Sequence, residues 1–154
     1  MTFGWTTQAQ RRQYRAMAVS TFLMAMIAPL SPADANAVSA VEMGDREITI
    51  RFDDVVEKAS SFVLAGPDRI AIDVTGAEPG APVSPIGVIR SVRQGRPDAN
   101  TARIVFDLAE PAVISGGQFA ADGRSLTLSV DPAADDDFSA AAKAARKLYL
   151  PPIA

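Results

Sequence analysis

The chain of 154 residues contains no histidine and no cysteine. Histidine is the usual general base near neutral pH and the commonest zinc ligand, so its absence excludes serine triads and histidine-based zinc sites. The lack of cysteine excludes disulfides, thiolate ligands and thiol nucleophiles. We therefore expect no metal site and no cofactor, and only carboxylate, lysine, tyrosine or serine–lysine chemistry remains open to this chain.

Aromatic residues are scarce, at 6% of the chain. Trp5 and Tyr14 lie in an N-terminal region that has the features of an export signal, while Phe52, Phe62 and Phe106 fall at predicted core positions. A platform of aromatic rings for stacking sugars is therefore not evident.

Basic residues are also too few for a nucleic-acid-binding surface. The formal net charge is −3, and after residue 37 acidic residues outnumber basic ones. Because nucleic-acid binding needs a positively charged surface that releases counterions, we expect no nucleic-acid partner.

Residues 1–37 have the features of a signal peptide. Three arginines precede an uncharged, mostly apolar run over residues 16–30, which is shorter than the ~20 residues of a membrane-spanning helix. The segment Ala35-Asn36-Ala37 places small residues where signal peptidase requires them, which predicts cleavage between Ala37 and Val38. The alternative is an uncleaved anchor helix.

The pair Arg11-Arg12 also resembles a twin-arginine export motif, although Arg15 occupies a position where an aliphatic residue is usual. Both the Sec and the twin-arginine route remain open. Either route predicts a periplasmic protein that contacts the membrane only during export.

From residue 38 onward, apolar and polar residues alternate as they do in strands with one buried and one wet face. The apolar members of the clearest sets are Ile48, Ile50 and Phe52; Ile70, Ile72 and Val74; Ile104, Phe106 and Leu108; and Leu126, Leu128 and Val130. Together with the turn residues between them, the pattern predicts strands near 38–43, 47–53, 59–65, 68–74, 87–94, 101–108, 112–118 and 124–131.

The strand pattern occurs twice. Residues 40–44 resemble 91–95, residues 49–53 resemble 103–107, and residues 69–74 resemble 125–130. The proline-containing run 77–85 lies between the halves and would connect them. Residues 38–131 therefore predict an all-β fold, a sandwich of two small related sheets that arose by internal duplication.

Residues 132–154 differ from the rest in composition. Asp135–Asp137 precede an alanine-rich stretch that ends in basic residues, which complements a helix dipole and predicts a short helix over about 137–148. We interpret residues 132–154 as a helical, proline-rich linker towards a further domain.

The order of the motifs resembles the AMIN domain, the non-catalytic N-terminal module of periplasmic N-acetylmuramoyl-L-alanine amidases. The similar segments are Phe62–Val74, Ile89–Gly95 and Arg103–Leu108, and the resemblance covers about residues 38–131. It implies a symmetric sandwich that binds peptidoglycan and helps to place a zinc hydrolase at the division site, with division-site or envelope proteins as further partners. The Asp-x-Gly-His-Gly start of the catalytic domain does not occur in this chain, so we expect no catalysis from it.

Four arginines are the candidate ligand-binding residues: Arg69, Arg90, Arg93 and Arg103. The stem peptides of peptidoglycan carry carboxylates, which suit the planar guanidinium group. The structural alternative is a solvated strand face on which these arginines form weak cross-strand ion pairs. In particular, Arg69 with Asp73 and Arg103 with Asp107 have the spacing that places two residues on one face of a strand.

Two rival functions remain. An exposed sheet edge could dock a secretin or divisome protein, as related modules occur in pilus secretins. Asp73 and Asp107 could form an acid–base couple for glycan cleavage, although nothing else in the sequence favours it. Calcium binding by Asp53-Asp54 or by Asp135–Asp137 lacks the loop pattern of a dedicated site.

Overall fold

The strands follow the predicted alternation closely. The computed structural model describes residues 35–153, so most of the predicted signal peptide, with Trp5 and Tyr14, lies outside the described residues. The strands of the duplicated segment are β1 (Val38–Met43), β2 (Glu47–Phe52), β3 (Lys58–Leu64), β4 (Arg69–Thr75), β5 (Ile89–Asp98), β6 (Thr101–Leu108), β7 (Ala112–Phe119) and β8 (Ser125–Pro132). All eight predicted strands are present, and their ends differ from the prediction by a few residues.

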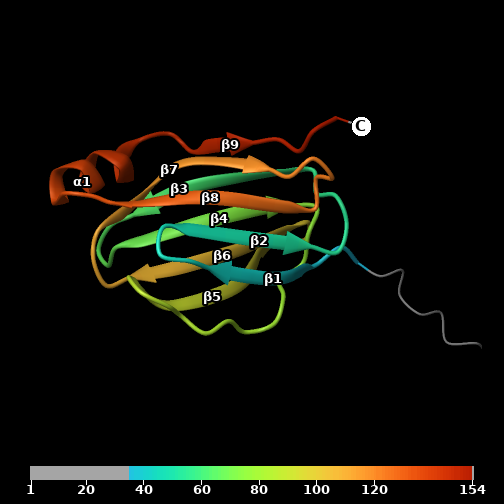
Figure 1. Cartoon of the computed structure of the whole chain (residues 1–154), viewed down its shortest axis with the longest axis horizontal. Helices are drawn as coiled ribbons and strands as arrows, with labels where there is room; N and C mark the ends of the chain where they lie inside the picture. Colours follow the sequence, from blue (N-terminus) through green and yellow to red (C-terminus); the bar gives the residue numbers. More distant parts are fainter. Residues whose placement is uncertain (1–34, 154) are drawn as a thin grey trace, which may run out of the picture. The chain divides into compact units, whose positions relative to one another are not determined.

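These strands form two antiparallel sheets (Figure 1). The four-stranded sheet has the order β1-β2-β8-β7, and the five-stranded sheet has the order β5-β6-β4-β3-β9, where β9 (Lys147–Tyr149) comes from the C-terminal segment. The first half of the duplication comprises β1 to β4, and the second comprises β5 to β8. Each half contributes one hairpin to each sheet, so β1-β2-β8-β7 in one sheet is equivalent to β5-β6-β4-β3 in the other. The all-β sandwich of two related sheets is confirmed.

The strand register corrects one part of the predicted repeat. Ala40 pairs with Arg51 next to a bulge in β1, and Ser91 pairs with Asp107 next to a bulge in β5. Arg51 is therefore equivalent to Asp107, whereas the sequence comparison aligned it with Val105. A shift of two residues leaves every side chain on the same face, which is why the hydrophobic pattern alone does not reveal it.

The core lies between the sheets and consists of the predicted alternating residues. All twelve apolar residues of the four predicted sets are buried, and Phe106 and Ile104 are completely inaccessible. The prediction that Phe62 belongs to the core is wrong. Phe62 pairs with Ala71 across β3 and β4 and lies partly exposed on the outer face of the five-stranded sheet.

The C-terminal segment is part of the domain, which corrects its interpretation as a linker. A helix is confirmed, as α1 (Asp135–Lys143), but it ends earlier than predicted and β9 then pairs with β3. Phe138 of α1 and Tyr149 of β9 are buried, and the Tyr149 hydroxyl lies 2.9 Å from the hydroxyl of Ser61. Figure 1 shows this segment running along the sandwich beside β7 and β3.

Tyr149 lies at the edge of the gap between the sheets, and Gly117 of β7 makes room for it. A Cβ atom at Gly117 would lie 2.7 Å from the Tyr149 ring and 2.6 Å from Leu128. Since real Cβ atoms do not approach other atoms so closely, the glycine is needed for the C-terminal segment to dock.

The predicted connection between the halves is confirmed as a segment without a named strand, and it is fixed to the sandwich. The Gln94 side chain accepts a hydrogen bond from the Gly80 amide and donates one to the Ala81 carbonyl, both at 2.8 Å. A Cβ atom at Gly80 would lie 2.0 Å from the carbonyl oxygen of Val38, so only glycine permits this close approach of the loop to β1.

Candidate binding face

The outer face of the five-stranded sheet gathers arginines from three strands and from the C-terminal segment. Because side chains alternate along a strand, the residues next to the buried ones of β4, β5 and β6 point away from the core. We call this surface the arginine face, and it comprises Arg69, Arg93, Arg103 and Arg146 with the carboxylates of Asp73 and Asp107.

Asp73 is the central acceptor of the arginine face. Arg103 donates to its carboxylate from Nε and Nη2, at 2.6 and 2.8 Å, and Arg146 donates from Nη1 at 2.7 Å. Only 8% of Asp73 is exposed. Burial raises the pKa of Asp73, but the hydrogen bonds and charges of Arg103 and Arg146 outweigh it, so the pKa lies below its ordinary value.

Asp107 is the second acceptor. Arg93 donates to both of its carboxylate oxygens, at 3.1 and 2.8 Å, and the Ser91 hydroxyl donates to one of them. The hydrogen bond from Arg93, followed by that from Ser91, lowers the pKa of Asp107. Arg69 is the cross-strand partner of Asp107 in the β4–β6 ladder and donates through Nε to the Pro67 carbonyl at 3.2 Å.

Phe62 of β3 supports two of these arginines. The guanidinium carbon of Arg146 lies 4.0 Å from the centroid of the Phe62 ring, and that of Arg103 lies 5.2 Å from it. A guanidinium group over an aromatic face is attracted by the ring quadrupole, which holds both groups in place without using their N–H donors.

The arginine face is hollowed at two adjoining places. One hollow of about 510 Å³ includes Lys58, Asp73, Arg103 and Arg146 in its lining. A second hollow of about 360 Å³ lies between Arg93, Arg103 and the β5–β6 hairpin. Arg103 and Pro97 border both hollows, so the two lie side by side, and we call the pair the trough. Its charged lining is mostly basic but includes Asp73 and Asp98.

The structure brings three of the four predicted arginines together: Arg69, Arg93 and Arg103. Arg90 is exposed at the bulge of β5, and within residues 35–153 its side chain forms no hydrogen bond or ion pair. Sequence reasoning missed Arg146, because a residue of the predicted linker gave no sign that it would reach Asp73. The nearest signal was the run of basic residues that follows the helix.

The predicted same-face pairs have a different geometry from the one expected. Arg69 and Asp73 share a face of β4, and Arg103 and Asp107 share a face of β6. The ion pair, however, joins Arg103 to Asp73 across the two strands, and Arg69 is the cross-strand neighbour of Asp107. Because both carboxyls are held ionised by arginines, neither is suited to donate a proton as the general acid of glycan cleavage requires.

The outer face of the four-stranded sheet provides a contrast. Glu42 and Arg51 form an ion pair at 2.9 Å in the place that Arg93 and Asp107 occupy on the other sheet, with the charges reversed. The middle of this face carries Thr49 and Thr127, whose hydroxyls lie 3.2 Å apart. The duplicated architecture therefore has one arginine-rich face and one face that carries a threonine pair at its centre and an exposed ion pair beside it.

Over the described residues 35–153, no three acidic side chains lie close enough together to hold a metal ion, and Asp53-Asp54 and Asp135–Asp137 are no exception. The same part of the chain contains no helix that is long and apolar enough to cross a membrane.

The interleaved hairpins define a duplicated β-sandwich with one strongly charged outer face. The chain belongs to the AMIN domain family, whose pattern matches residues 37–130. AMIN domains are peptidoglycan-binding or targeting modules typical of periplasmic proteins. The comparison with curated proteins found no match.

Proposed function

We propose that the chain binds peptidoglycan through the arginine face. The observation that carries this proposal is the basic trough, in which Arg93 and Arg103 are fixed by bidentate pairs and still have unused donors. A guanidinium group has five N–H donors, and each of these two arginines uses two for its aspartate.

The remaining donors suit the carboxylates of peptidoglycan stem peptides. Four arginines and Lys58 on this face oppose Asp73, Asp98 and Asp107, so basic side chains outnumber acidic ones and the face attracts anions. Because the aspartates and Phe62 already fix the guanidinium groups, little side-chain entropy is lost when a carboxylate binds. Hydroxyls of Ser60, Thr75 and Thr101 border the trough and are available to glycan hydroxyls and amides.

We infer further that this binding localises an N-acetylmuramoyl-L-alanine amidase-like hydrolase on the cell wall. The support is the family membership together with the lack of histidine, which leaves this chain without the ligands of a zinc hydrolase.

The alternative is docking of a secretin or divisome protein through a sheet edge. The edge strand β5 carries two bulges and Pro97, and β1 carries one bulge. Bulges and prolines are devices that prevent an added strand from pairing. These features favour the trough over the β1 and β5 edges as the binding surface.

A pull-down with purified sacculi tests the proposal. We expect the wild-type protein to sediment with sacculi in low salt and to be released as salt screens the ion pairs. The variant Arg93→Ala with Arg103→Ala should lose about a hundredfold or more in affinity, since two charge-assisted contacts of ~1.5 kcal/mol or more are removed.

The matched control is Arg46→Ala with Arg51→Ala. It removes the same charge from the side of the four-stranded sheet, where Arg51 pairs with Glu42 and Arg46 lies 3.6 Å from Asp131. Binding that survives in the control and is lost in the test variant supports the arginine face. Equal binding by both variants and by the wild type, with circular dichroism showing that all are folded, would exclude it.

A further inference from the structure

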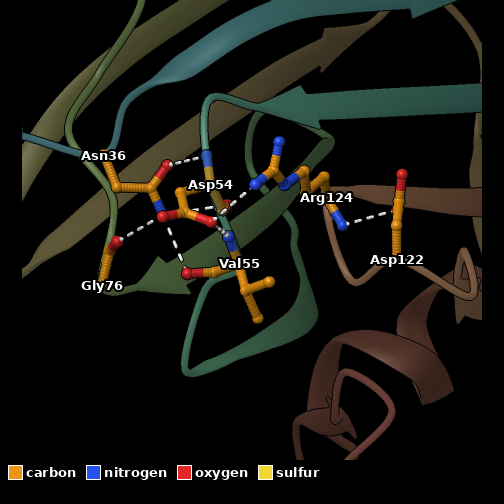
Figure 2. A network of polar contacts seen from close by, with 6 residues as sticks. All are labelled: Asn36, Asp54, Val55, Gly76, Asp122 and Arg124. Carbon is orange, nitrogen blue, oxygen red and sulfur yellow. Dashed lines mark hydrogen bonds and ion pairs between the residues drawn. The ribbon is translucent and has the colours of Figure 1, made fainter. Parts of the chain in front are cut away.

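Asn36 precedes β1, and its side chain ties together loops from distant parts of the chain (Figure 2). Its Nδ2 lies 3.0 to 3.1 Å from the carbonyl oxygens of Asp54, Val55 and Gly76. Its Oδ1 accepts a hydrogen bond from the Asp54 amide at 2.8 Å. One amide side chain thus links the β2–β3 loop to the end of β4.

The network continues to the β7–β8 turn. The Nη2 atom of Arg124 donates a hydrogen bond to the Asp54 carboxylate at 3.3 Å. The backbone amide of Arg124 donates to the Asp122 carboxylate at 2.9 Å. Figure 2 shows Asn36 and Arg124 on opposite sides of Asp54. Asn36 therefore belongs to a polar cluster that closes this end of the sandwich.

The backbone on either side of Asn36 is also part of the fold. The Asn36 carbonyl accepts from the Glu78 amide at 2.8 Å, and the Ala37 carbonyl accepts from the Asp53 amide at 3.0 Å. The Val38 amide then donates to the Glu78 carbonyl at 2.9 Å. Within the described residues 35–153, contacts with the sandwich are therefore already made by Asn36 and Ala37, ahead of Val38.

The sequence contains two overlapping sites with the small residues that signal peptidase requires. In the predicted signal peptide, Ala35-Asn36-Ala37 would direct cleavage before Val38, and Ala33-Asp34-Ala35 would direct cleavage before Asn36. We propose that the precursor is cut between Ala35 and Asn36, so that the mature chain begins with the asparagine that closes the network.

Two physical reasons favour this site over the bond between Ala37 and Val38. A cut before Val38 would remove Asn36 and Ala37 with all of their hydrogen bonds and leave the partner amides without them. In a chain that folds before the cut, the bond between Ala37 and Val38 is held by hydrogen bonds on both sides, whereas Ala35 is exposed and free to enter an extended protease cleft.

N-terminal sequencing and intact-mass measurement of the mature protein test the proposal directly. The full chain would be expressed in a bacterium with a periplasm and purified from the periplasmic fraction. We expect the sequence to begin at Asn36. A start at Val38, or an unprocessed chain, would overturn the proposal.

A pair of variants separates the two sites. Ala33→Phe places a large side chain at the third position before the proposed cut and leaves the other site unchanged, so we expect precursor to accumulate or the cut to move to Val38. Ala37→Val makes the last position before the alternative cut β-branched, and we expect it to leave the start at Asn36. The reverse behaviour of the two variants would contradict the proposal.

Thermal unfolding of the mature protein adds a second readout, because Asn36 can affect Tm only if it is retained in the mature chain. Asn36→Ala should lower Tm by about 5 °C or more, since four side-chain hydrogen bonds are lost. Asn100→Ala is the control, because the Asn100 side chain makes one exposed hydrogen bond, to Glu57 at 3.3 Å. An unchanged Tm for Asn36→Ala would remove the structural reason for the proposed site.

Discussion

At the scale of the residue, Asp73 shows how a nearly buried carboxylate is tolerated on the outer face of a sheet. An ionised group removed from water is costly unless charged partners replace the lost hydration. Arg103 and Arg146 supply three hydrogen bonds from two different elements, and Phe62 fixes both guanidinium groups from the side. Asp73 thereby holds the C-terminal segment and the trough together.

Asp73→Asn is expected to lower the free energy of unfolding by about 2 kcal/mol. The change retains the shape of the side chain but removes the charge that two arginines share, and hydrogen bonds to charged groups contribute about 1.5–3 kcal/mol. Urea denaturation measures the effect. The control is Asp131→Asn, whose carboxylate makes a 3.6 Å pair with the exposed Arg46 and should cost about 0.5 kcal/mol or less. Similar losses in both variants would contradict the central role of Asp73.

At the scale of the element, the short strand β9 completes the five-stranded sheet. Ala59 pairs with Tyr149, and Ser61 pairs with Lys147, so the strand covers the edge of β3. The ammonium of Lys147 also donates to the Ile114 carbonyl of β7 at 3.0 Å, which links the two sheets. The buried Tyr149 ring therefore decides whether this edge of the sandwich is closed.

Tyr149→Ala should detach β9 and cost about 3 kcal/mol or more, as truncation of large buried aromatic side chains does. Amide hydrogen exchange should show lost protection in β3 while the central pair β4 and β6 stays protected. Leu148→Ala is the control in the same strand, because Leu148 is 59% exposed and should change stability by no more than about 0.5 kcal/mol. Retained protection of β3 in Tyr149→Ala would show that β9 is not needed to close the edge.

At the scale of the whole molecule, duplication produced two equivalent sheets whose outer faces have diverged. The ion pair of Glu42 with Arg51 and that of Arg93 with Asp107 occupy equivalent places with reversed charges. Only the five-stranded sheet adds Arg103 and the C-terminal Arg146 to its pair. The symmetry therefore belongs to the core, while the asymmetry of charge gives the molecule one candidate binding face.

The stability of the whole molecule is expected to fall at acid pH. Asp73 and Asp107 have folded-state pKa values below the ordinary ~3.9, so the unfolded chain binds more protons than the folded one near pH 4. Their stabilisation is complete above pH ~5, begins to be lost near pH 4 and is lost fully once pH falls below the folded-state pKa values.

Urea midpoints between pH 6 and pH 2.5 would measure this acid loss, with the double variant Asp73→Asn and Asp107→Asn for comparison. The variant should be less stable at pH 6 and should lose less stability below pH 4. Parallel curves for the two proteins would show that other carboxyls cause the acid loss.

Particular residues show which parts of this structure were predictable. The alternation that buries Ile48, Ile50 and Phe52 is a local property of a strand, so the strands and their inward faces followed from it. The outward position of Phe62 did not, because β3 reads Lys-Ala-Ser-Ser-Phe-Val-Leu and its small residues Ala59 and Ser61 face the core. The strand β9 was not predicted either, because three residues are too few to show an alternating pattern.

The sequence by itself determined the strand order along the chain, the inward face of the central strands, the duplication and the family, because each is encoded by local periodicity or by the order of motifs. Only the tertiary structure decided that the halves interleave, that Arg51 is equivalent to Asp107, that Arg146 returns to Asp73 and that Asn36 closes the network. These are contacts between residues far apart in the chain, and their partners are chosen by packing and by the need to pair buried polar groups, neither of which a local pattern records.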